Sequence, residues 1–399
     1  MLFTIITDVK DILVGLTVIG ALGGISLIAI NWRYFLSQLN KNRYLYISLA
    51  FLIPIGIASI DTMFPQKRFF VFYTMLLYVF IGVLPIYVLY TNGNFKRLEL
   101  LTVIGILYVA IDAIIQWLTG YHTLGYNPPI IDRVYGIFGE WAHLSYFLAT
   151  FSPILFYYLY TKIEQKPSLL KIVGASIALF LVVVAIMLGG ARAGIITLLA
   201  SLFFFITYLF YTKKIKHRLR FVIVSVSVLA IFIFIASFIP VVQDRFINTT
   251  AAFGSDDFLH RFTSFRTNVW YVGFSEIPNY LFNGVGTRGF NNLYQTYPED
   301  YKIFPYIYHP HLHGLEVIIE TGLIGFIPYV LICLYLLRRM ITAKAGNMWL
   351  MVGFLALMPI NSHVALYQNY WLPIVWVPIM IGLALAYQAD NFPKTGNNH

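Results

Sequence analysis

Charged residues are scarce in this chain of 399 residues, where they make up only 11% of the total. A soluble domain carries about 25% charged residues. Hydrophobic residues reach 59%, and a water-soluble fold of this length could not bury that much apolar surface. The composition therefore excludes a soluble protein and indicates that lipid covers much of the chain.

Acidic residues and cysteine are also rare. The 17 acidic residues stand against 27 basic ones, which gives a net charge of +10. In a membrane protein such an excess marks cytoplasmic loops and contacts with anionic lipid headgroups. Nucleic acid is not an expected partner, because no contiguous solvated basic face is visible. Cys333 is the only cysteine, which excludes an intramolecular disulfide and indicates a packing role.

Long apolar runs take up most of the sequence. A spanning helix needs about 20 mostly apolar residues, and continuous runs lack the alternation of a transmembrane barrel strand. The sequence therefore predicts an all-α polytopic membrane protein with about eleven transmembrane helices. The runs lie near residues 12–32, 44–63, 69–91, 99–119, 138–161, 169–189, 193–212, 220–240, 314–337, 347–364 and 370–388.

Basic loops predict the orientation of these helices. The densest basic cluster, from Lys213 to Arg220, places its loop in the cytoplasm. Because each span takes the chain to the opposite side of the membrane, counting spans from this loop also places the other basic loops in the cytoplasm. The loop with Lys67 and Arg68 is the exception. The N-terminus and two long loops, near 120–137 and 241–313, then lie outside the cytoplasm.

The 241–313 connection is far longer than two helices need, and its aromatic-rich composition is not that of a disordered segment. We expect it to form a periplasmic subdomain with short helices. The predicted organisation is a transmembrane bundle of about eight helices over 1–240, this loop subdomain over 241–313, three transmembrane helices over 314–388, and a cytoplasmic tail over 389–399.

Several arginines fall on the predicted outer side. Arg192 lies in GGARAG, where a helix begins, and a helix N-terminus with a guanidinium suits a phosphate or pyrophosphate. An arginine that snorkels to the headgroups is the competing interpretation. Further arginines that could meet a polyanionic lipid, or could equally be surface charges, are Arg133, Arg261, Arg266 and Arg288.

The stretch HPHLHGLEVIIETGLIG is the densest cluster of titratable residues, with His309, His311 and His313 on alternate positions. In an extended segment this spacing would point all three imidazoles to one side. A zinc site is one interpretation; we favour a histidine general base, because imidazole titrates near neutral pH. Glu316 and Glu320 could orient that base or bind helix-end amides.

Two further features bear on the chemistry. No DxD pair or dense carboxylate set is present, which argues against a divalent-metal-dependent transferase, so we expect neither a metal nor a cofactor. Asp112 lies in the middle of the 99–119 run, where an ionisable residue is a functional candidate by default. We favour a buried hydrogen bond to a neighbouring Tyr or Asn as its role.

Five of these motifs together resemble the O-antigen ligase and polymerase family. They are RVYGIFGEWAHLS, ARAG at a helix start, FRTNVW, GVGTRGF and HLHG…ETGLIG, and they cover roughly residues 130–330. The resemblance implies a GT-C type membrane fold, usually of twelve helices. It also implies periplasmic transfer of O-antigen from undecaprenyl pyrophosphate to lipid A–core, with inversion and without metal or nucleotide.

The resemblance also assigns roles. Arg192, Arg266 and, less regularly, Arg288 match the arginines that hold the carrier pyrophosphate. The catalytic histidine is His311 by its spacing from Gly322, or His313 by the HLHG string, and the family's asparagine after it is missing in both cases. We expect an O-antigen ligase of the bacterial inner membrane. An O-antigen polymerase is the nearest alternative, and a lipid-linked oligosaccharide flippase or other transporter is a more distant one.

Overall fold

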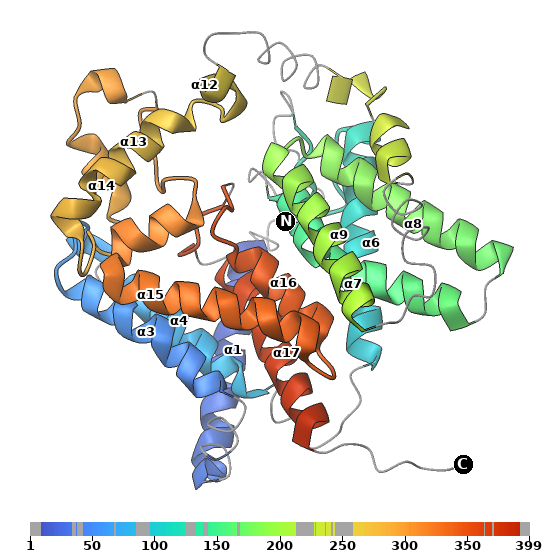
Figure 1. Cartoon of the computed structure of the whole chain (residues 1–399), viewed down its shortest axis with the longest axis horizontal. Helices are drawn as coiled ribbons and strands as arrows, with labels where there is room; N and C mark the ends of the chain where they lie inside the picture. Colours follow the sequence, from blue (N-terminus) through green and yellow to red (C-terminus); the bar gives the residue numbers. More distant parts are fainter. Residues whose placement is uncertain are drawn as a thin grey trace, which may run out of the picture. The chain divides into compact units, whose positions relative to one another are not determined.

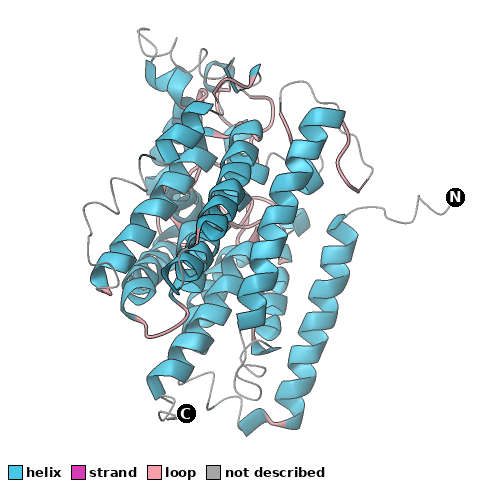
Figure 2. Cartoon of the chain, turned by 90° about the vertical axis from the view of Figure 1, so that its right-hand side faces the viewer, coloured by secondary structure: helices cyan, strands magenta, loops and turns pink. Residues whose placement is uncertain are grey.

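The computed structural model describes residues 9–33, 37, 43–67, 69–84, 96–124, 133–138, 143–165, 168–212, 227, 229–235, 237–240, 242–243, 258–302, 304–362, 364–368 and 371–391. Within these ranges the chain forms helices and loops only (Figure 2). Five of the described helices are long and apolar enough to cross a membrane, and four more are shorter and apolar. The chain is an all-α polytopic membrane protein.

Apolar side chains surround most of these helices, as expected where lipid replaces water. A helix satisfies its own backbone hydrogen bonds, so it is the element that such runs adopt in lipid. Among the described residues, the helices of the larger compact unit are α1 (Val9–Ile30), α3 (Tyr44–Ile60), α4 (Phe70–Ile81), α13 (Arg266–Glu276), α14 (Phe290–Gln295), α15 (His313–Thr342), α16 (Asn347–Leu357) and α17 (Leu372–Asn391) (Figure 1).

This unit consists of residues 1–94 and 265–399. α1 packs against α4, α3 against α15, and α16 against both α15 and α17. Large side chains fill its interior, among them Tyr44, Tyr329 and Trp376, all of them buried. The Tyr44 hydroxyl donates to the Val79 carbonyl at 2.7 Å, which shows how a buried phenol finds a backbone partner.

The second unit, residues 95–264, contains α6 (Lys96–Thr119), α7 (Leu144–Gln165), α8 (Leu169–Leu188), α9 (Arg192–Tyr211) and the short α12 (Phe258–Phe262). α7 packs against α9, and α6 packs against α8. Ser152 and Ser201 share a buried hydrogen bond of 2.6 Å between α7 and α9. Small residues let these helices approach closely, because a Cβ at Gly194 would collide with Ser145.

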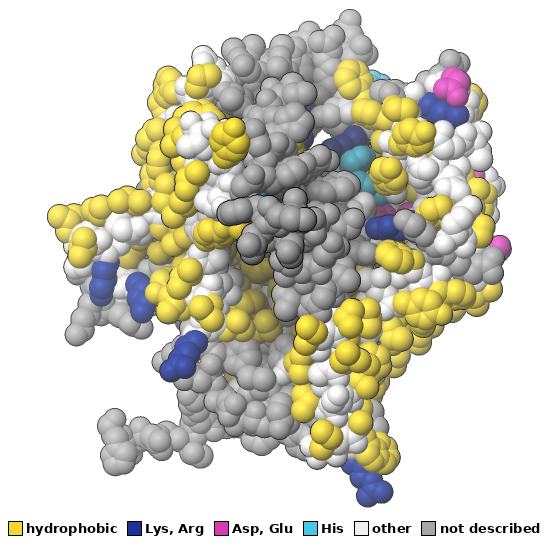
Figure 3. All heavy atoms as spheres, turned by 180° about the vertical axis from the view of Figure 1, so that it is seen from behind, with side chains coloured by type: hydrophobic (Ala, Val, Ile, Leu, Met, Phe, Trp, Pro, Cys, Tyr) yellow, Lys and Arg dark blue, Asp and Glu magenta, His cyan; other side chains and the backbone are white. Residues whose placement is uncertain are grey.

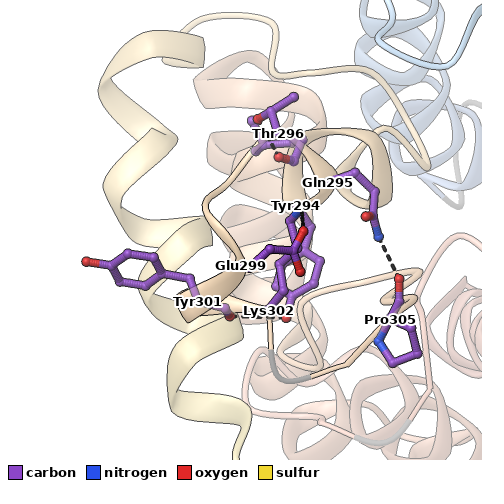
Figure 4. Close-up of polar contacts among 8 residues, drawn as sticks. Tyr294, Gln295, Thr296, Glu299, Tyr301, Lys302 and Pro305 are labelled. Carbon is purple, nitrogen blue, oxygen red and sulfur yellow. Dashed lines mark hydrogen bonds and ion pairs between the residues drawn. The ribbon is translucent and has the colours of Figure 1, made fainter.

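The part of the 241–313 connection that belongs to the larger unit has its own small core. Val269 of α13, Val285 and Phe290 of α14 are buried members of this core, which Ile319 of α15 completes, while the short turn η4 (Ile277–Tyr280) packs against it and η5 (Glu299–Tyr301) follows α14. Polar contacts close the chain around this core, as Figure 4 shows. Gln295 donates to the Pro305 carbonyl at 2.8 Å, and Lys302 pairs with Glu299 at 2.9 Å.

Ten of the eleven predicted spans coincide with a described helix: α1, α3, α4, α6, α7, α8, α9, α15, α16 and α17. The largest difference in a described stretch is that α16 ends at Leu357, not near 364. Met358 follows, with φ −51° and ψ 131°, and stands before Pro359; a residue before proline avoids the helical conformation. Residues 358–368 are therefore free to form a connection.

Some predictions fall outside the described residues. The span near 220–240 does so for the most part, as do the basic cluster Lys213 to Arg220 and the tail beyond 391. The same holds for residues 125–132 and 244–257 of the two long loops.

Candidate functional site

The histidine stretch leads directly into α15, whose first residue is His313. The His313 N–H donates to the Asn361 carbonyl and the Gly314 N–H to the Pro359 carbonyl, both at 2.9 Å. These bonds satisfy amides that a helix N-terminus leaves without intrahelical partners. The connection between α16 and α17 is thereby fixed against the start of α15.

His311 departs from the extended conformation that its alternate spacing suggested. Its φ is 53°, in the left-handed region that few non-glycine residues adopt. Its ring lies against that of His309, with the centroids 4.0 Å apart. The three imidazoles therefore do not form one row, and no group of three His, Cys, Asp or Glu in the described ranges could hold a metal ion.

The hydrogen bond of His311 defines its tautomer. Nδ1 lies 3.2 Å from the carbonyl oxygen of Ser362. A carbonyl only accepts, so Nδ1 carries the proton and the neutral ring has its lone pair on Nε2. The side chain is half-buried. This is the arrangement that a general base requires.

Arg266, the first residue of α13, meets the same connection. Its Nη1 donates to the hydroxyl oxygen of Ser362 at 3.3 Å. Phe265 and Ser264 just before it both have positive φ, which turns the chain into the helix. Arg266 and His311 thus contact the side chain and the carbonyl of one residue, and we call Arg266, His311 and Ser362 the Ser362 cluster.

His313 is placed differently. It is fully buried, and its Nε2 donates to the Val364 carbonyl at 2.8 Å. A histidine enclosed in this way can anchor the 358–368 connection but cannot reach a substrate hydroxyl. The geometry favours His311 of the two.

Two sequence motifs interlock at a kink in α15. Gly322 has φ 60° and ψ −163° inside the helix. The N–H groups of Leu323 and of the residue after it donate hydrogen bonds to the carbonyl oxygens of Leu281 and Phe282, respectively. The Ile319 and Glu320 carbonyls in turn accept from Val285 and Gly286 of GVGTRGF. The kink therefore pairs GVGTRGF with ETGLIG by backbone hydrogen bonds.

This pairing positions Arg288 beside two buried carboxylates. Glu320 accepts a 2.6 Å hydrogen bond from the Arg288 N–H, and Arg288 has a φ of 63°. Glu316 accepts from Leu366 N–H at 3.0 Å and Tyr367 N–H at 3.3 Å. The Arg288 guanidinium lies 5.6 Å from the centre of the Phe70 ring. In Figure 3, histidine, basic and acidic side chains gather right of centre.

A cavity of about 130 Å³ opens among these side chains. Arg288, Glu316 and Glu320 line it together with residues that the motifs did not single out. The amide side chains among them are Asn291, Asn292 and Gln368, and the aromatic ones are Phe64, Tyr308 and Tyr367. All of them belong to the larger unit.

The second unit has its own pair of arginines. Arg192 is the first residue of α9 and is half-buried, following a turn in which Gly190 has φ 64°. Val134 N–H donates to the Leu188 carbonyl at the end of α8 at 3.3 Å. Because Arg133 directly precedes Val134, this hydrogen bond places the backbone of Arg133 beside the turn that leads to Arg192.

Asp112 is buried and fixes a neighbouring loop. One of its oxygens accepts from both Thr123 N–H, at 2.7 Å, and the Thr123 hydroxyl, at 2.5 Å. Its partner is therefore a threonine rather than the expected Tyr or Asn. Burial lowers the pKa of nearby His122, and the Asp112 charge partly opposes that shift. One turn along, Gln116 accepts from Tyr135 N–H and Gly136 N–H.

Sequence reasoning did not find Ser362, Gln116 or Gln368. Each is an uncharged polar residue outside any motif, and nothing in its neighbourhood marks it. Arg261 belongs to α12, but its side chain lies outside the described residues.

Comparison with known proteins supplies the remaining observation. A family model described as O-Antigen ligase matches residues 177–330, a range that includes Arg192, Arg266, Arg288 and His311. No curated protein matches the chain. Residues 177–330 of this chain are therefore similar to the O-antigen ligase family, and most of the motifs named above lie in this range.

Proposed function

We propose that this protein is an O-antigen ligase. It transfers O-antigen polysaccharide from undecaprenyl pyrophosphate to a sugar hydroxyl of lipid A–core, on the periplasmic face of the inner membrane, through a GT-C type fold. The family match supports an enzymatic role in O-antigen and lipopolysaccharide biosynthesis, with lipid-linked polysaccharide and lipid A–core as substrates in general.

The Ser362 cluster carries the proposal. His311 Nε2 takes the proton of the acceptor hydroxyl while that oxygen attacks the anomeric carbon. The bond from this carbon to the pyrophosphate oxygen breaks with inversion, and its electron pair leaves on the pyrophosphate. Arg266 stabilises the charge that develops there, which is the kind of fixed electrostatic assistance that lowers such barriers most. Both residues are held on Ser362.

Within the second unit, we propose Arg192 as a pyrophosphate-binding arginine, with Arg133 in support. The start of α9 combines the positive end of the helix dipole with a guanidinium. The carrier pyrophosphate is already a good leaving group, so arginines supply the needed positive charge. The reaction as proposed uses no metal and no nucleotide.

The test is expression in a ligase-null strain that supplies compatible core and O-antigen, followed by lipopolysaccharide gel analysis. We expect a ladder from the wild type, none from Arg266→Ala, and a weak one from Arg266→Lys, which keeps the charge but not the fork of donors. Arg338→Ala is the control, because Arg338 is an exposed arginine of α15 in the same unit.

Unligated core from well-expressed wild type would contradict ligation. The chain would then be tested in a polymerase-null strain. Restored long O-antigen there would identify an O-antigen polymerase, which transfers the glycan to a second carrier-linked glycan instead of lipid A–core. A ladder that survives both His311→Asn and Arg266→Ala would contradict the roles assigned to these two residues.

A further inference from the structure

The cavity beside Arg288 differs in chemistry from the Ser362 cluster. Its volume is about 130 Å³, which is the volume of several water molecules at about 30 Å³ each. The cavity can therefore hold one polar ring, but not several linked sugar units. Glu320 is only 1% exposed, yet its Oε1 has no hydrogen-bond partner among the described residues. A buried oxygen in this state indicates a ligand group that the cavity receives.

Other polar atoms around the cavity also have bonding capacity left. Asn291 uses its oxygen on Ile307 N–H, so its amide nitrogen remains as a donor. Asn292 uses its nitrogen on the Met63 carbonyl, so its oxygen remains as an acceptor. Arg288 lines the cavity as a donor, and Gln368 offers one group of each kind. The cavity therefore presents donors and acceptors side by side.

This mixture argues against a pyrophosphate guest at Arg288. A pyrophosphate has acceptors only, and it would meet the buried carboxylates Glu316 and Glu320 within the same cavity. With no proton to donate, a pyrophosphate would leave the side-chain oxygen of Asn292 in the cavity without a hydrogen bond. A hydroxyl both donates and accepts, so it can bond to Glu320 Oε1 and to an amide or guanidinium at the same time.

The aromatic lining fits the same kind of guest. Phe64, Tyr308 and Tyr367 border the cavity, and Tyr308 is 66% exposed. A pyranose ring presents C–H faces as well as hydroxyls, and an aromatic ring gives such a face an apolar surface to pack on.

We propose that this cavity binds one sugar ring of a polysaccharide substrate, through Glu320, Arg288, Gln368 and the two asparagines. The inference rests on the proposed function, since it assigns the cavity to the carbohydrate of that reaction. Under this proposal the two arginines have different roles: Arg288 binds sugar hydroxyls, and Arg266 binds the pyrophosphate.

Binding is tested by saturation-transfer NMR on the purified full chain in detergent micelles. The probes are methyl glycosides of common hexoses and N-acetylhexosamines, with sodium pyrophosphate as the competing anion. We expect transfer to at least one glycoside, with affinity reduced about tenfold in Gln368→Ala and in Glu320→Gln. The control Asn279→Ala, an exposed amide of the same unit, leaves binding unchanged.

Gln368→Ala removes a side chain without a described hydrogen bond, and Glu320→Gln keeps an acceptor for the Arg288 N–H, so both variants should fold. No transfer to any glycoside, or transfer that neither variant weakens, would overturn the proposal. Competition by pyrophosphate that Arg288→Ala abolishes would also overturn it, in favour of an anion site.

Ligation kinetics separate the two sources of the sugar. A raised KM for carrier-linked glycan in both variants, with kcat little changed, assigns the cavity to the donor. A raised KM for lipid A–core assigns it to the acceptor, and unchanged KM values for both overturn the proposal. Wild type that binds a glycoside but ligates nothing would refute the ligase function and leave the sugar site standing.

Discussion

Gly322 is a position where a single methyl group should disturb the structure strongly. Its φ of 60° with ψ −163° lies in a region that glycine alone adopts readily, and any other residue there costs about 1–3 kcal/mol. An added Cβ would also collide with the carbonyl carbon and oxygen of Phe282 and lie 2.5 Å from Asn283 N. Backbone atoms cannot rotate away, so overpacking adds about 1–3 kcal/mol.

Gly322→Ala should therefore lose about 4 kcal/mol of stability, the middle of the summed range. That corresponds to an unfolding midpoint lowered by about 5 °C for a chain of 399 residues. The assay is thermal unfolding of the purified variant in detergent, followed by the lipopolysaccharide gel. Because the kink pairs GVGTRGF with ETGLIG, we expect the ladder to be lost as well.

Gly105→Ala is the matched control, since a Cβ there meets nothing within 4 Å in the middle of α6. It should be neutral or stabilising by up to about 1 kcal/mol. A Gly322→Ala variant with the wild-type midpoint, measured beside that control, would refute the reasoning about the kink.

Two further predictions concern other parts of the chain. Asp112→Ala should destabilise by about 3 kcal/mol, because two Thr123 donors lose their acceptor. Asp112→Asn should retain both fold and ligation in denaturation and gel assays; loss of ligation with the fold intact would show that the charge itself is used. Burial and the hydrogen bond to Glu276 raise the pKa of Tyr297 above its ordinary value. The stability from this shift is present below about pH 10 and is lost as the pH rises through the folded-state pKa, so Tyr297→Phe should flatten the alkaline fall in the denaturation midpoint.

The spans could be predicted from the sequence because an apolar run is a local property. Arg192 at a helix start was likewise readable from GGARAG. The end of α16 was not predicted, although Pro359 was the available signal. Apolar residues continue beyond Pro359, so the hydropathy of this stretch stays high although the backbone is no longer helical.

The internal arrangement of the candidate site could not be read in the same way. Ser362 lies 51 residues from His311 and 96 from Arg266, and only the folded chain brings them together. The alternate spacing of the histidines assumed an extended backbone, which the left-handed φ of His311 breaks. The two histidines also differ in burial, since His311 is half-buried and His313 is fully buried. The motif alone does not predict this difference.

The central claim is that His311 is the general base, and the most direct measurement is the initial rate of ligation by purified His311→Asn. Asparagine tolerates the left-handed backbone and cannot take the proton. We predict a fall in kcat of about 100- to 10,000-fold, with an unchanged unfolding midpoint and an unchanged KM for the carrier-linked donor. His260→Ala, which alters a histidine of α12, should keep the wild-type rate. A His311→Asn protein that ligates at a rate within a few-fold of wild type would contradict the account.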